Sequence, residues 1–325
     1  HTGNFFNYDG EYDTEDTVKN FVLLEEPDSL QPAPAQPPFH MINRLDPEHV
    51  AADIYHWTPN IIDYSREDHQ FTYQLAFLAD INTSNPVVVD VMKKTYGDWI
   101  RNTGVDAFRI DTVRYVEPEF FRRFMHDDDG IVATANESGR DQFLAFGEVF
   151  DTSLPFANGG ERALAEFVGT DDDPILPSVI NFPLFAELNA VFGQGRPTAQ
   201  LVYRLEQHMT MMRDPWRTPN FIDNHDTSRF LAGGDETGLR QALTTLFTIP
   251  GIPVIYQGTG QMHRESRKAM FAGGFETGED QFDTTAPMYR FIRELAELRK
   301  SDKVLTRGSL EPLGSEMNGP GLVAW

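Results

Sequence analysis

Short apolar runs alternate with longer amphipathic segments from about residue 85 onward, and this alternation restricts the folds that the chain can adopt. The apolar runs have the length of strands, and we predict strands at 105–110, 143–146, 178–182, 220–222 and 252–256. The segments between them repeat apolar residues at helical spacing, and we predict helices at 86–102, 117–125, 161–168, 198–212, 239–248 and 288–300. Strands and helices that alternate in this way build a parallel α/β sheet.

Three carboxylates directly follow three of the predicted strands, namely Asp111, Glu148 and Asp226. In barrels and doubly wound sheets the active site lies at the C-terminal ends of the strands, so these side chains would converge. A single acidic residue is most often a solvated surface residue, and Arg109 with Asp111 could equally form a structural ion pair. Three carboxylates at matched strand ends are harder to explain in that way. Two carboxylates held close together are the equipment of glycoside hydrolysis.

Charge and composition exclude several other classes of protein. The net charge of −23 disfavours nucleic acid and anionic membranes as partners. The chain has no Cys, so disulfides, thiolate catalysis and Cys-based zinc sites are excluded. Neither a Gly-x-Gly-x-x-Gly nor a Walker pattern accompanies any strand, and no apolar run reaches the length of a membrane span.

Residues 1–85 do not follow the alternation of the rest of the chain. Prolines are dense between Pro27 and Pro38, where neither a helix nor a central strand can form. Four histidines are scattered in this part without the spacing of a metal site, at His40, His49, His56 and His69. We interpret the segment as a loop-rich excursion from the α/β fold.

The chain resembles the α-amylase superfamily in five segments that occur in the order of that family. Three of them, 104–115, 146–150 and 221–226, resemble signature regions at barrel strands. Segment 78–82 is similar to the family's additional motif at the end of the inserted domain B, and 251–259 to the motif at the eighth barrel strand. His1 resembles the last residue of the first signature region. The resemblance implies a (β/α)8 TIM barrel and activity on α-glucans.

The resemblance also implies roles for individual residues. Asp111 would be the nucleophile, Glu148 the general acid and base, and Asp226 the carboxylate that binds sugar hydroxyls and stabilises the transition state. Arg109 would keep Asp111 ionised, because an adjacent cation lowers the pKa of a carboxyl group. His225 would hydrogen-bond the sugar at the cleavage point.

Further implied contacts concern the rest of the substrate and a structural Ca²⁺ ion. His1 would join His225 on the sugar, and Arg114 and Tyr115 fall where the family forms an acceptor subsite. Asp80 matches a carboxylate that binds Ca²⁺ in many members, and the carbonyl oxygen of Tyr115 falls where another ligand often lies. Carboxylate and carbonyl oxygens are the ligands that Ca²⁺ prefers.

The family's map divides the chain into three parts. Residues 1–85 would be a domain B-like insertion, 86–302 barrel strands four to eight with their helices, and 303–325 the start of a C-terminal β domain. On this map the chain is truncated at both ends, so a signal peptide is not observable and an extracellular or periplasmic location is expected. The segment Gln257–Gly260 departs from the family's usual Tyr-Gly-Thr-Glu.

Several functions stay open on the residues alone. The first is a retaining glycosidase that cleaves α-1,4-glucosidic bonds in starch, maltooligosaccharides or related α-glucans through a covalent glycosyl-enzyme. The second is an α-glucanotransferase on the same scaffold, such as a cyclodextrin-forming enzyme. A non-catalytic binding relative is a third reading, which the presence of all three carboxylates disfavours. A metal phosphohydrolase built on His225 and Asp226 lacks further ligands on helices.

Overall fold

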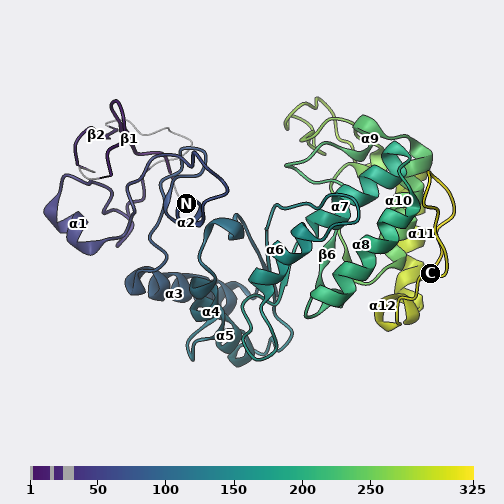
Figure 1. Ribbon diagram of the computed structural model, residues 1–325, viewed down its shortest axis with the longest axis horizontal. Helices are drawn as coiled ribbons and strands as arrows, with labels where there is room; N and C mark the ends of the chain where they lie inside the picture. The colour runs from purple at the N-terminus through teal and green to yellow at the C-terminus, as the bar shows by residue number, and fades with distance from the viewer. Residues whose placement is uncertain (1–2, 15–17, 25–32) are drawn as a thin grey trace. The chain divides into compact units, whose positions relative to one another are not determined.

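The computed structural model describes residues 3–14, 18–24 and 33–325 (Figure 1). These residues form two compact units, which we describe separately. Unit 1 contains the chain up to Phe108 together with Thr112–Phe143, and unit 2 contains Arg109–Asp111 and Leu144–Trp325. His1 and the first half of the proline-rich stretch, residues 27–32, lie outside the described residues.

The N-terminal part of unit 1 is loop-rich, as predicted, but it contains short elements that the sequence did not indicate. Strands β1 (Phe6–Tyr8) and β2 (Phe21–Leu23) pair antiparallel, and two helices of six residues follow, α1 (Pro47–Ala52) and α2 (Glu67–Thr72). Buried aromatic and aliphatic side chains form the core of this part, among them Phe5, Phe6, Phe21, Tyr55, Trp57, Ile54 and Ile81. Each of these elements spans at most two helical turns or three strand residues, which is too short to produce a recognisable hydrophobic period in the sequence.

Helix α3 (Pro86–Thr103) confirms the prediction for 86–102. Its N-cap Asn85 accepts a hydrogen bond from the amide of Val87, and Gly104 ends it at a φ of 75°, which favours glycine. Helix α4 (Pro118–His126) confirms the prediction for 117–125, whereas α5 (Ile131–Glu137) was not predicted. The buried ammonium group of Lys93 joins α3 to the α4–α5 turn through Asp127 at 2.9 Å and Asp129 at 2.6 Å.

The predicted strands are present in two sheets, but each strand is short. They are β3 (Ala107–Ile110), β4 (Leu144–Gly147), β5 (Ser178–Val179), β6 (Pro219–Asn220) and β7 (Ile252–Pro253). The order β3-β4-β5 forms one sheet and β6-β7 another, with parallel pairing of β4 with β5 and of β6 with β7. The amide of Asn181 donates to the carbonyl of Pro219 at 3.0 Å and continues the pairing from β5 to β6. Parallel strands that alternate with helices confirm the α/β class.

The helices of unit 2 pack around a large apolar core. They are α6 (Gly159–Val168), α7 (Phe182–Leu188), α8 (Thr198–Met211), α9 (Phe230–Gly233), α10 (Glu236–Thr248), α11 (Pro287–Ser301) and α12 (Val304–Arg307). Figure 1 shows α7 beside α8 and α10 beside α11, in teal to yellow-green. Leucine side chains from these helices dominate the core, including Leu184, Leu188, Leu201, Leu239 and Leu243.

The prediction of a strand over 178–182 is wrong at its C-terminal end. Phe182 opens helix α7, because the side chain of Asn181 accepts a hydrogen bond from the amide of Leu184 and Pro183 occupies the first turn. A short segment such as 178–182, with three apolar residues, cannot by its periodicity distinguish a buried strand from the start of a buried helix. The result places the end of β5 directly before a helix that belongs to the core.

The last residues contact the start of α8. The hydroxyl of Thr198 donates to the carbonyl of Leu322 at 2.9 Å and accepts from the amide of Glu316 at 2.8 Å. Residues 303–325 contain α12 and one antiparallel bridge between Gly314 and Ala324. The division at 85 and 302 remains a prediction, since the two compact units divide the chain at other positions.

Candidate active site

One guanidinium group contacts two of the three predicted carboxylates. Arg109, near the end of β3, forms ion pairs through Nη1 with Oδ1 of Asp111 at 2.6 Å and through Nη2 with Oε1 of Glu148 at 3.2 Å. Glu148 follows β4, and its amide donates to the carbonyl of Ile110 at 2.8 Å. Strand pairing therefore holds the ends of β3 and β4 together, and Arg109 gathers their two carboxylates.

The two carboxylates lie in different environments. The side chain of Asp111 is 65% exposed, whereas that of Glu148 is 9% exposed. Burial acts to raise the pKa of Asp111, but hydrogen bonds with Arg109 and Glu148 and the charges of Arg109 and His225 lower it below its ordinary value. A carboxylate beside a guanidinium group is favoured in its ionised form, so the arrangement suits an ionised Asp111.

Asp226 is held by a tight turn after β6 and by two basic side chains. Its amide donates to Oδ1 of Asn224 at 2.9 Å, and the amide of Asn224 donates to the hydroxyl of Thr227 at 3.0 Å. Nε2 of His225 lies 2.9 Å from Oδ2 of Asp226, and Nη2 of Arg267 lies 2.7 Å from Oδ1. The side chain of Asp226 is 34% exposed, so it remains accessible to a ligand.

Arg267 is the residue that the sequence analysis missed. It lies in an irregular segment between β7 and α11, where no strand or helix pattern marks a position. Its Nε also donates to the carbonyl of His225 at 2.8 Å, so one side chain fixes both members of the His-Asp pair. A motif search around strand ends could not find it.

The neighbouring Asp223 has a different role from Asp226. It is buried, and its carboxylate accepts a hydrogen bond from the amide of Phe230 at 3.1 Å. Burial raises the pKa of Asp223, and Arg229 lies 4.0 Å away with its guanidinium over the ring of Tyr256. These contacts fix the turn after β6 on its buried side. Of the two carboxylates Asp223 and Asp226, only Asp226 is accessible to a ligand.

A pocket of about 390 Å³ adjoins this site within unit 2. Asp226 and Ser228 line it together with Phe150, Phe185 and Asn189. The ring of Phe185 stacks on Phe221 at 4.8 Å between centroids, which gives this wall a fixed aromatic surface. The aromatic rings could stack on a flat apolar face of a ligand, and the hydroxyl and carboxylate groups could hydrogen-bond to its hydroxyl groups.

Arg114 and Tyr115 belong to unit 1, in the turn Val113–Tyr115. Nε of Arg114 donates to Oε1 of Gln70 in α2 at 3.4 Å, and the ring of Tyr115 contacts that of Tyr64 edge to face. His1 lies outside the described residues. Within unit 2, Arg109 contacts Asp111 and Glu148, and His225 contacts Asp226. The charge of His225 also lowers the pKa of Asp111. One shared active site for these five residues and the acceptor contacts remain predictions.

Asp80 is buried and paired with a histidine. Its Oδ2 lies 2.6 Å from Nδ1 of His56, and burial raises the pKa of Asp80. Within residues 3–14, 18–24 and 33–325, no group of three or more His, Asp or Glu side chains is arranged to hold a metal ion. Ca²⁺ takes six to eight oxygen ligands, so Asp80 and the Tyr115 carbonyl do not by themselves make a complete site.

Comparison with known proteins identifies relatives along most of the chain. The family described as "Alpha amylase, catalytic domain" matches residues 1–153. An "Alpha-amylase" of Streptomyces lividans is 32% identical over 268 residues, which cover 71% of this chain and 27% of that protein. A "Cyclomaltodextrin glucanotransferase" of Klebsiella oxytoca is 26% identical over 299 residues, covering 82% of this chain and 44% of that one. The chain thus spans less than half the length of these two relatives.

Solved structures agree on the fold. An α-amylase of Anoxybacillus has a TM-score of 0.67 at 23% identity, covering 83% of this chain and 56% of that chain. A cyclomaltodextrin glucanotransferase with a three-domain ABC distribution has a TM-score of 0.68 at 25% identity, covering 82% and 51%. The α/β fold is that of the TIM-barrel catalytic domain of these enzymes. The motifs, the carboxylates gathered at the strand ends and these likenesses agree, and the chain belongs to the α-amylase superfamily.

Proposed function

We propose that the protein is a retaining glycosidase that cleaves α-1,4-glucosidic bonds in starch, maltooligosaccharides or related α-glucans. The observation that carries the proposal is the position of Arg109 between Asp111 and Glu148, at 2.6 and 3.2 Å. A cation in this place keeps Asp111 ionised for attack. Glu148, which is 9% exposed, would be the proton donor. A retaining reaction needs the two in these complementary states.

The reaction would proceed in two displacements. Asp111 attacks the anomeric carbon while Glu148 transfers its proton to the departing glycosidic oxygen, so the glucosidic bond breaks and a β-glycosyl ester forms on Asp111. Glu148 then takes a proton from water, the water oxygen bonds to the anomeric carbon, and the ester bond to Asp111 breaks. Each step returns Glu148 to the protonation state that the next step requires.

Asp226 and His225 would bind the hydroxyl groups of the sugar that is cleaved. Their partial exposure and their position beside the pocket lined by Phe150 and Phe185 support this assignment. Contacts of Arg114, Tyr115 and His1 with the substrate remain part of the proposal on the family resemblance alone. The same holds for the division into a domain B-like part at 1–85, barrel strands four to eight at 86–302 and the start of a β domain from 303.

A transferase is the second candidate, because relatives named cyclomaltodextrin glucanotransferase match over most of the chain. Hydrolase and transferase differ only in whether water or a sugar hydroxyl attacks the glycosyl ester. Products from starch and maltoheptaose separate them: linear short sugars indicate hydrolysis, and cyclic or longer products indicate transfer.

A calcium ion that supports unit 1 and an extracellular or periplasmic location are further proposals. Asp80 would supply a carboxylate to the ion, with the Tyr115 carbonyl as a second ligand. In the residues that the structure describes, no helix has the length and hydropathy to cross a membrane.

The replacement of Asp111 by Asn tests the function directly. In the full-length protein, D111N should lose activity on starch by at least roughly 10⁴-fold while its circular dichroism spectrum is unchanged. The matched control is D106N, because Asp106 precedes the same strand, is 87% exposed and pairs with Arg140. Near-normal activity of D111N would remove Asp111 as the nucleophile.

A further inference from the structure

The segment 149–158, which we call the acid loop, begins directly after the proposed general acid Glu148 and ends before α6. Three of its apolar side chains point outward, with exposed fractions of 49% for Phe150, 77% for Leu154 and 44% for Phe156. Because so much of its apolar surface faces solvent, hydrophobic burial alone does not account for the loop's conformation. Something else must hold its backbone.

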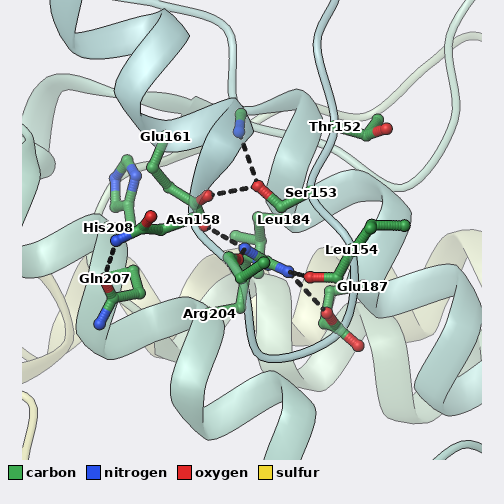
Figure 2. A network of polar contacts seen from close by, with 12 residues as sticks. Thr152, Ser153, Leu154, Asn158, Glu161, Leu184, Glu187, Arg204, Gln207 and His208 are labelled. Carbon is green, nitrogen blue, oxygen red and sulfur yellow. Dashed lines mark hydrogen bonds and ion pairs between the residues drawn. The ribbon is translucent and has the colours of Figure 1, made fainter.

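The buried guanidinium of Arg204 supplies that support (Figure 2). Arg204 lies in α8 with its side chain 1% exposed, and it donates from Nη1 to the carbonyl of Ala157 at 2.8 Å and from Nη2 to the carbonyl of Leu154 at 3.1 Å. Both acceptors belong to the acid loop. Arg has several donors in a rigid plane, so one side chain can fix two carbonyls at once.

Two buried glutamates hold Arg204 in place. Nη1 lies 2.5 Å from Oε1 of Glu161 in α6, and Nη2 lies 3.2 Å from Oε2 of Glu187 in α7. Glu161 also accepts a hydrogen bond from Ser153 at 2.6 Å, and Ser153 accepts one from the amide of Gly160 at 2.8 Å. Figure 2 shows that the carboxylates of Glu161 and Glu187 and the carbonyl of Leu154 face the guanidinium, and that the hydroxyl of Ser153 faces Glu161. The loop is thus hydrogen-bonded directly to α8 and α6, and to α7 through Arg204.

The loop forms part of the candidate site. Glu148 immediately precedes it. The ring of Phe150 packs on Phe182 at 4.3 Å between centroids and lines the same pocket as Asp226. A displacement of the loop would move this wall and the residue that follows Glu148. Small misplacements of positioning groups are costly in rate, by up to roughly a hundredfold for 1 Å.

Stability alone gives a weak reason for such a cluster. Two buried carboxylates and one guanidinium are costly to desolvate, and apolar residues of similar volume often stabilise a fold as well or better. The contacts that an apolar replacement cannot reproduce are those to the two loop carbonyls. We propose that Arg204 is a positioning residue, which holds the acid loop in the conformation that the substrate and Glu148 require. This inference rests on the proposed glycosidase function.

The test compares R204M and the apolar variant R204M/E161L/E187L with the wild type in the full-length protein. Amide hydrogen exchange should quicken in residues 149–158 and stay unchanged in α10 and α11. KM for maltoheptaose should rise roughly tenfold, with a smaller loss in kcat. The reason is that the loop would contact the substrate equally in the ground state and in the transition state, so its displacement mainly weakens binding. R204K retains the cation but cannot reach both carbonyls, and it should restore part of the loss.

A matched control is R213M. Arg213 also donates to two backbone carbonyls, those of Thr170 at 3.2 Å and Leu176 at 3.3 Å, but these lie in the loop before β5. R213M should leave KM and the exchange of residues 149–158 unchanged.

The outcomes distinguish this inference from the proposed function. A wild type that is inactive on every α-glucan contradicts the function, while loop exchange still reports on Arg204. An active wild type with an unaltered loop and unaltered KM in the apolar variant overturns the positioning role. Unfolding of R204M, R204K and the apolar variant alike would show that Arg204 serves folding only, and would overturn it as well.

Discussion

Arg267 donates a hydrogen bond from Nη2 to Oδ1 of Asp226 at 2.7 Å, although the two residues lie 41 positions apart in the chain. His225 contacts the other oxygen of Asp226 at 2.9 Å. Each oxygen of this carboxylate therefore has a basic partner, and the two contacts together fix the orientation of the group. A carboxylate that binds sugar hydroxyls depends on this orientation, because hydrogen bonds weaken steeply with angle.

We predict that R267Q lowers kcat/KM on maltooligosaccharides by roughly ten- to a hundredfold, the scale of one charge-assisted hydrogen bond. Thermal unfolding should change little, because Arg267 is 60% exposed. R293Q serves as the control, since Arg293 is 57% exposed and pairs only weakly with Glu297, at 3.7 Å. Equal kcat/KM in R267Q and R293Q would show that Asp226 keeps its orientation without Arg267.

The sequence predicted the carboxylates of the site but not all of their partners. Asp111, Glu148 and Asp226 could be found because each follows an apolar run that reads as a strand, and strand ends converge in parallel α/β folds. Arg267 and Arg204 carry no such mark: the first lies in an irregular segment, and the second is one basic residue in a helix. Their contacts depend on how distant segments pack, which local periodicity does not encode.

The strand boundaries were less predictable than the strands themselves. Only Ser178 and Val179 of the apolar run 178–182 pair as a strand, because Asn181 and Pro183 begin a helix there. Burial separates Asp223 from Asp226 in the same motif, and a sequence pattern alone gives both the same weight. Tertiary packing determines both where β5 ends and which of Asp223 and Asp226 is buried.

Removal of the cation at Arg109 should shift the pH dependence of activity. The pKa of Asp111 lies below its ordinary value although burial acts to raise it, because hydrogen bonds with Arg109 and Glu148 and nearby charge favour the ionised form. An ionised nucleophile then persists at low pH. In R109Q the acid limb of kcat/KM should move up by about one pH unit or more. If the acid limb of kcat/KM in R109Q lies at the same pH as in the wild type, the electrostatic role of Arg109 is contradicted.

The buried imidazole of His208 should make the free energy of unfolding decrease when the pH is lowered. Burial lowers the pKa of His208 to about 4 from an ordinary value of 6.5. Between these values the unfolded chain binds a proton that the folded chain does not, so the free energy of unfolding decreases as pH falls. One such group gives a loss of about 2 kcal/mol between pH 7 and pH 5.

Urea unfolding of H208Q and of the wild type at pH 7 and pH 5 measures this contribution. The decrease from pH 7 to pH 5 should be smaller in H208Q by about that amount, whereas H40Q, at an exposed histidine, should behave as the wild type. An identical decrease in H208Q and wild type would mean that His208 takes up its proton in the folded state.

Chelation tests the calcium proposal. If an ion supports unit 1 through Asp80, a chelator should lower the melting temperature of the full-length protein, and Ca²⁺ should restore it. D80N should show a lower melting temperature that no longer responds to the chelator. If neither stability nor activity of the wild type responds, Asp80 does not hold a calcium ion, and its contact with His56 is structural.

The last prediction concerns the stereochemistry of cleavage. Asp111 and Glu148 follow β3 and β4, which are neighbours in the sheet, and Arg109 contacts both carboxylates. Two carboxylates on neighbouring strands that one guanidinium contacts at 2.6 and 3.2 Å fit the ~5–5.5 Å separation of retaining enzymes, whereas an inverting enzyme needs ~6.5–9.5 Å to place a water between them. Cleavage should therefore pass through an ester on Asp111, and the first product released from a maltooligosaccharide should be the α-anomer. Proton NMR of the anomeric signals during the first minutes, before mutarotation equalises them, measures this directly. A reaction that releases the β-anomer first would exclude the covalent route and assign Asp111 to the activation of water instead.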